Sequence, residues 1–114
     1  MRRHKYILFP LFFFFVCKAI ADDLNEGFLK LSENKPEEAI QLWTPLAEAG
    51  DKVAQASLGL LFQTGQGTEV DFIRALELFR ASAKQGYPFA FTALGNSYHA
   101  VSYTHLRAHE TAYY

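Results

Sequence analysis

Residues 39–67 of the chain read AIQLWTPLAEAGDKVAQASLGLLFQTGQG. Before Gly50, the apolar residues recur at spacings of three and four, which is typical of one face of a helix. Gly50 can adopt the left-handed conformation that ends a helix, and Asp51 is a good N-cap for the next one. The glycines of residues 65–67 indicate a loop. The stretch therefore predicts two consecutive helices joined by a tight turn.

The same pattern returns 36 residues later along the chain. Ala39–Trp43 aligns with Ala75–Phe79, and the glycines that follow these segments also align. A period of this length is typical of helix–turn–helix repeats, which stack because a single repeat cannot bury its own apolar face. The sequence therefore predicts an all-α fold, a short α-solenoid of antiparallel helix pairs. The helices are expected near residues 24–31, 36–49, 51–64, 71–85 and 88–99.

Three residues inside these expected helices are of types that disfavour a helix. Pro45 removes the backbone hydrogen bond to the Gln41 carbonyl, so we expect a kink there. Gly59 and Gly95 each cost about 1 kcal/mol relative to alanine in a helix interior. We expect close packing between helices to compensate for that cost at both glycines.

The combined motif resembles the Sel-one-like repeat family, whose repeats are similar to tetratricopeptide repeats. The resemblance covers residues 36–99, with repeat-like segments at 36–71 and 72–100, and residues 24–32 match only loosely, as a capping half-repeat. It implies roughly two repeats, the second incomplete, in an array truncated at its C-terminus. The open end should then leave four residues partly exposed: Phe89, Phe91, Leu94 and Tyr98. The residues that match the family pattern, all expected to be structural, are Ala39, Trp43, Gly50, Ala54, Leu58, Gly59, Gly65, Gly67, Ala75, Phe79, Ala83, Gly86, Ala90, Leu94, Gly95 and Tyr98.

Residues 1–21 have the order of a secretory signal peptide. Met1–Lys5 is basic, Tyr6–Val16 is apolar and uncharged, and a small-x-small cleavage site ends at Ala21. A membrane anchor is the alternative, but Lys18 interrupts the apolar run well short of the roughly 20 residues that a spanning helix needs. We therefore expect cleavage after Ala21 and a periplasmic or secreted protein without a membrane span.

The carboxy-terminal residues 101–111 read VSYTHLRAHET and resemble the translation of a transposon-type sequencing adapter, whose bases encode these residues in order. We therefore expect residues 101–114 to be a foreign tail, unstructured or with only incidental helix, and residues 22–100 to hold the repeat region. His105 and His109 have the i, i+4 spacing of a zinc site. Because they lie in this tail, we interpret the pair as accidental and expect no metal site.

Charge and chemistry argue against several functions. Residues 22–100 contain six basic and eleven acidic residues, an excess that disfavours binding to nucleic acid or anionic membranes. The single cysteine, Cys17, precedes the expected cleavage site, and the residues before it do not favour a lipoprotein signal. Because the repeat region has no histidine except His99 and no S-x-x-K motif, we expect neither a catalytic constellation nor a cofactor.

The expected function is that of an exported, non-catalytic interaction scaffold, with a protein or peptide partner on its concave face. The alternatives are a β-lactamase-like or other hydrolase of the cell envelope, which the family resemblance suggests, and the repeat part of a larger cell-wall-associated protein. Residues 22–100 lack the cysteine pairs of the β-lactamase-like relatives, which argues against the hydrolase. Trp43 could stack on a ligand, but its alignment with Phe79 favours core packing.

Overall fold

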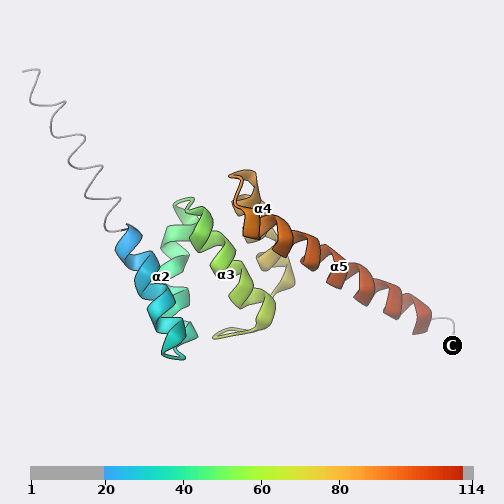
Figure 1. The fold of residues 1–114 in the computed structure, drawn as a ribbon. Helices are drawn as coiled ribbons and strands as arrows, with labels where there is room; N and C mark the ends of the chain where they lie inside the picture. Colours follow the sequence, from blue (N-terminus) through green and yellow to red (C-terminus); the bar gives the residue numbers. More distant parts are fainter. Residues whose placement is uncertain (1–19, 112–114) are drawn as a thin grey trace, which may run out of the picture.

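The computed structural model describes residues 20–111, with side chains for residues 20–100. Regular secondary structure in this range is entirely helical. The helices are residues 20–32, α2 (Pro36–Glu48), α3 (Lys52–Thr64), α4 (Phe72–Lys84) and α5 (Pro88–Thr111). They pack side by side in chain order, and α3 contacts α2, α4 and α5 (Figure 1). The predicted all-α repeat solenoid is confirmed.

The ends of the helices follow from local side chains, as the sequence predicts. The carboxylates of Asp51 and Asp71 accept hydrogen bonds from the backbone amides of Ala54 and Arg74, at 2.8 and 3.1 Å, and so cap α3 and α4. Gly50 ends α2 in the left-handed region, with φ of 101°. Its amide and that of Asp51 bond back to the last turn of α2, which satisfies carbonyls that the helix itself leaves free.

The loop between α3 and α4 packs against the beginning of α2. Gly67 has φ of 74°, and a Cβ atom there would lie 2.8 Å from the backbone nitrogen of Glu37. Both the left-handed conformation and the close approach therefore require glycine. Residues 65–67 form the inter-helix turn that the sequence predicts, and Gly67 lies against the beginning of α2.

The core contains the apolar stripes of the predicted helices. Trp43 and Phe79 are its largest members, and both are 0% exposed, so the prediction of core packing for Trp43 is confirmed. The Trp43 indole nitrogen donates to the Leu24 carbonyl at 3.1 Å, which satisfies its only donor group. No buried side-chain nitrogen or oxygen in the described residues lacks a hydrogen-bond partner.

The helix glycines differ from one another in their surroundings. A Cβ atom at Gly59 would lie 2.8 Å from the Phe79 ring, and one at Gly27 would overlap the Trp43 indole. Close packing is therefore confirmed at Gly59, although the neighbour is an aromatic side chain rather than a helix backbone. The same prediction is wrong for Gly95, which has nothing within 4 Å of the Cβ position. No helix of the described residues lies opposite it.

Polar side chains, one buried and one exposed, connect the end of α4 to the turn between α2 and α3 and to α3. The Ser82 hydroxyl donates to the Lys52 carbonyl at 2.7 Å, and Ser82 is 0% exposed. The Gln85 amide donates to the Gly50 carbonyl at 2.8 Å and to the Gln55 side-chain oxygen at 3.1 Å. These bonds join the end of α4 to the residues where α2 ends and α3 begins.

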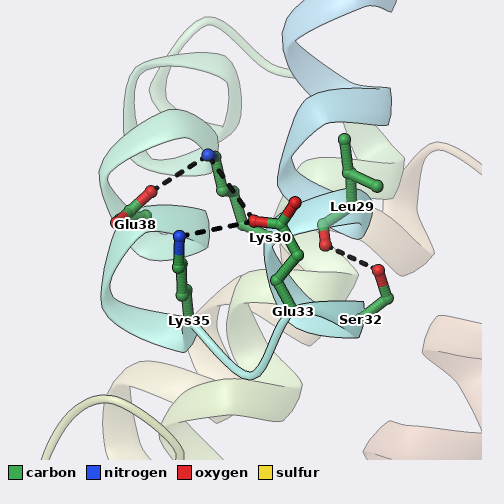
Figure 2. Close-up of polar contacts among 6 residues, drawn as sticks. All are labelled: Leu29, Lys30, Ser32, Glu33, Lys35 and Glu38. Carbon is green, nitrogen blue, oxygen red and sulfur yellow. Dashed lines mark hydrogen bonds and ion pairs between the residues drawn. The ribbon is translucent and has the colours of Figure 1, made fainter.

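Exposed ion pairs connect helix 20–32 to α2 (Figure 2). The Lys30 ammonium group lies 3.2 Å from the Glu38 carboxylate and 3.8 Å from that of Glu33, which also lies 3.6 Å from Lys35. The hydrogen bond to Glu38, with the charges of Glu38 and Glu33, raises the pKa of Lys30 above its ordinary value. These pairs lie at the surface, so they add little stability compared with the core.

Some predictions about the helices and the chain ends need comment. Helix 20–32 is longer than the predicted 24–31, and most of the predicted signal peptide lies outside the described residues. The predicted kink at Pro45 stays a prediction, although Pro45 does lie inside α2. The helix α5 continues to Thr111, so residues 101–111 of the expected foreign tail are helical, while the foreign origin of the tail stays a prediction. Adding residues to an existing helix is far less costly than starting one, and residues 101–111 contain no glycine or proline.

Candidate peptide-binding groove

A hydrophobic groove of about 260 Å³ crosses one surface of the repeat stack. Its lining comes from helix 20–32, α2, α3, the loop after α3 and the residues where α5 begins. Seven of the nine lining residues are apolar or aromatic, and none carries a charge. They are Phe28, Leu31, Trp43, Ser57, Leu60, Leu61, Gln66, Tyr87 and Phe89. We call this site the hydrophobic groove.

One wall of the hydrophobic groove is an aromatic pair. The Phe28 ring meets the Trp43 indole edge to face, with centroids 4.9 Å apart and planes at 64°. The contact with Gly27 and the hydrogen bond to Leu24 hold the indole in place. Because Trp43 is fixed and Phe28 is 44% exposed, this wall presents an ordered aromatic surface to solvent.

The other exposed lining residues of the hydrophobic groove come from α3 and the beginning of α5. Leu60 is 39% exposed on α3, and Phe89 is 44% exposed at the start of α5. The rings of Tyr87 and Phe89 lie 6.3 Å apart at 52°. Side-chain hydrogen bonds in the groove can come from Ser57, Gln66 and the Tyr87 hydroxyl group. The chemistry of the groove is therefore that of apolar contact with a few polar anchors, which suits peptide side chains.

A second depression of about 240 Å³ lies among α2, α3 and α4 and is more polar. It is lined in part by Glu48, Arg74 and Glu77. The Arg74 guanidinium group lies 4.6 Å from the centre of the Phe62 ring, in a cation–π contact. Arg74 thus covers a core aromatic ring, and the depression offers less apolar surface than the hydrophobic groove.

Neither site holds the ligands of a metal centre. Among the residues with described side chains, no three His, Cys, Asp or Glu side chains lie close enough to hold one ion. The side chains of His105 and His109 lie outside the described residues. Within residues 20–111, no helix has both the length and the hydropathy that spanning a membrane requires.

Of the residues that match the family pattern, only Trp43 lines the hydrophobic groove. The pattern includes seven residues that are at most 2% exposed: Ala39, Trp43, Ala54, Leu58, Ala75, Phe79 and Ala90. At the predicted open end, Tyr98 is 47% exposed, Phe91 is 57% exposed and Leu94 is half-buried. The predicted exposure of this end is therefore confirmed, and Phe89 from the same set forms part of the groove.

Sequence reasoning missed Phe28 and Leu60 as groove residues. Each directly follows a helix glycine, Gly27 or Gly59, that packs against an aromatic ring from the next helix. Aligning these two glycines would have found both positions. Their spacing is 32 rather than 36 residues, because the turn before α2 is shorter than the loop before α4. A comparison at a fixed spacing of 36 residues therefore does not align Gly27 with Gly59.

The family model described as Sel1 repeat matches residues 25–51 and 52–87, together more than half of the chain. These units pair helix 20–32 with α2 and α3 with α4, so the match begins earlier than the resemblance at 36–99 suggested.

Over 58 residues, the chain is 43% identical to an uncharacterized protein of Neisseria meningitidis serogroup B. That alignment covers 51% of this chain but only 12% of the relative. No solved structure matches the chain. The helix pairs and the family model together show that the chain belongs to the Sel1 repeat family.

Proposed function

We propose that the chain is an exported, non-catalytic scaffold that binds a protein or peptide segment in the hydrophobic groove. Sel1 repeats generally mediate protein–protein interactions and are typically non-catalytic. The observation that carries the proposal is the groove itself, where Phe28, Leu60 and Phe89 expose apolar surface from three different helices. Exposed apolar surface in one concave patch is costly in water and is typical of interaction sites.

The lining residues limit the chemistry of the partner. A segment with two or three apolar side chains would bury Phe28, Leu60 and Phe89, and burial gains about 25 cal/mol per Å² of apolar surface. A charged side chain at the centre of the segment would lose water without finding an opposite charge. The proposed partner is therefore a peptide segment with an apolar centre.

The groove can be tested with a displayed library of random 12-residue peptides. The purified chain should enrich peptides with two or three apolar residues, and Leu60→Lys should lose that enrichment. Ile73→Lys is the matched control, because Ile73 is 75% exposed and does not line the groove. Trp43 is the only tryptophan, so selected peptides should also shift its emission. Equal enrichment by both variants, or none by the unmodified chain, contradicts the proposal.

The exported location rests on residues 1–21 and needs its own experiment. The full-length chain, expressed in a Gram-negative host, should be recovered from the periplasm with Asp22 at its amino terminus. Replacing Ala19 and Ala21 by bulky residues should block cleavage and leave the longer form. Recovery of the uncleaved chain from the cytoplasm would contradict export but leave binding in the groove untouched.

A further inference from the structure

Two exposed lining residues of the hydrophobic groove occupy the same place in successive repeats. Phe28 and Leu60 each directly follow a helix glycine, and they are 44% and 39% exposed. On α5 this place belongs to Asn96, which directly follows Gly95 and is also exposed. We call Phe28, Leu60 and Asn96 the groove row. Along the groove row, which takes one residue from each of three helices, the chemistry changes from apolar to polar.

Asn96 lies on the side of α5 that faces the hydrophobic groove. It follows the groove residue Phe89 by close to two helical turns, so both side chains project from the same face of α5. The Gln63 amide group of α3 donates to the Ser97 hydroxyl group of α5 at 3.1 Å. This bond joins the two helices one residue from Asn96 and one helical turn from Leu60. The groove row is therefore continuous with the groove.

The spacing of the groove row determines which backbone conformation of a bound segment fits it. Neighbouring packed helices have axes about 8–10 Å apart, so the side chains that the segment presents must recur at that distance. A β-strand repeats its face every second residue, at roughly 6.6 or 13 Å, and neither distance matches. A polyproline II segment has three residues per turn and a rise of about 3.1 Å, so every third side chain returns after about 9 Å. The polyproline II conformation therefore fits the groove row.

The lining of the hydrophobic groove suits the same conformation. Four of its nine residues are aromatic and none is charged, and proline-rich segments dock in aromatic-lined grooves. The polyproline II backbone has no internal hydrogen bonds, so its carbonyl groups can accept from Ser57, Gln66 and the Tyr87 hydroxyl group. An α-helix uses its carbonyl groups internally and would leave these three donors without backbone partners. The donors therefore favour an extended proline-rich segment over a helix.

We propose that the partner segment is proline-rich and binds as a polyproline II helix, with apolar residues on Phe28 and Leu60 and a polar residue on Asn96. These three residues of the segment are three positions apart, and we number them 1, 4 and 7. The inference rests on the proposed function and adds the conformation and the residue period of the partner. Asn96 determines specificity at position 7, because an apolar residue there would leave the donor and the acceptor of its amide unpaired.

The test measures the binding of labelled nine-residue peptides to the purified chain by fluorescence anisotropy. The first peptide is Leu-Pro-Pro-Leu-Pro-Pro-Gln-Pro-Pro, and the second has the same residues in reverse order, so that both chain directions are covered. The matched control for each peptide moves the second leucine one position closer to the first and keeps the composition. The better of the two peptides should bind about tenfold more tightly than its control, because the control leaves one leucine side chain in water.

Substitutions in the chain test the third position of the groove row. Asn96→Leu should reverse the preference at position 7, so that a peptide with leucine there binds about tenfold more tightly than the peptide with glutamine. Ile73→Asn is the matched control, because Ile73 is 75% exposed and does not line the groove. Benzoylphenylalanine at position 7 of the peptide should cross-link to α5 near Asn96 in the unmodified chain, a measurement that requires no variant to fold.

Three results would overturn the inference: equal affinities for the two leucine spacings, a preference at position 7 that Asn96→Leu leaves unchanged, or cross-links that miss α5. The random peptide library separates this inference from the proposed function. If the library yields apolar peptides without the three-residue spacing, the inference fails and the proposed function stands. If it yields no peptides at all, the proposed function itself is contradicted.

Discussion

At the scale of single residues, glycine has two different roles in the same repeat position. Gly59 lacks a side chain because the Phe79 ring occupies the space, whereas Gly95 faces solvent. The intrinsic cost of glycine in a helix is about 1 kcal/mol at either site. Only the surroundings of Gly59 and Gly95 differ. The same substitution at both positions therefore separates the free energy of packing from that of helix propensity.

Gly59→Leu should destabilise the chain by ~1–3 kcal/mol, because Phe79 is fully buried and its ring cannot move aside without strain. For a domain of this size, each kcal/mol lowers the melting temperature by roughly 4–8 °C. Thermal unfolding followed by circular dichroism measures the change. An unchanged melting temperature would show that the close contact with Phe79 contributes nothing.

Gly95→Leu is the control, and its effect should have the opposite sign. A leucine at Gly95 meets no neighbour and improves helix propensity, so stability should rise by up to about 1 kcal/mol. If both leucine variants destabilise the chain to the same extent, backbone geometry rather than packing explains the two glycines.

At the scale of helices, the cap of α3 can be tested directly. The Asp51 carboxylate accepts from the Ala54 amide at 2.8 Å at the beginning of α3, and Asp51→Ala leaves that amide without its partner. The expected loss is about 1 kcal/mol in the free energy of unfolding, measured by urea denaturation. Asp51→Ser should retain most of the stability because a hydroxyl oxygen can replace the carboxylate. Equal losses for both variants would contradict a capping role.

The caps also show why some features could be predicted from the sequence. Asp51 and Asp71 bond to amides three residues away, so residue type and position suffice to predict them. The buried positions of Trp43 and Phe79 were predictable for a similar reason, since a helical stripe and a repeat both indicate them. These features depend on the chain within one or two helices.

The groove depends on contacts between helices that are not adjacent in the sequence. Phe28, Leu60 and Phe89 each lie outside the predicted core, and only the stacking of three helices brings them together. Gly95 has the same sequence context as Gly59, yet no helix lies opposite it in the described residues. A residue pattern predicts which face of a helix is apolar, but it does not show what covers that face.

At the scale of the whole molecule, the large buried side chains lie between α2 and α4, while α5, among its described side chains, buries only the small residues Ala90, Ala93 and Ser97. The largest fully buried side chains are those of Trp43, Phe79, Leu58, Leu61 and Ser82, which all precede α5. In a repeat array each unit contacts only its neighbours, so the free energy of unfolding depends on the interfaces that are already formed. An exposed aromatic ring on α5 should therefore contribute little.

Phe79→Ala and Phe91→Ala remove the same atoms from two phenylalanines with very different burial. Phe79 is 0% exposed, and its loss should cost ~3–5 kcal/mol because a large cavity opens between α3 and α4. Phe91 is 57% exposed, so its loss should change stability by no more than about 0.5 kcal/mol. Urea unfolding followed by the emission of Trp43 measures both, since Trp43 is the only tryptophan and is not altered. A loss above 2 kcal/mol for Phe91→Ala would mean that the Phe91 ring is already covered in the free protein, because solvent-exposed rings carry no such energy.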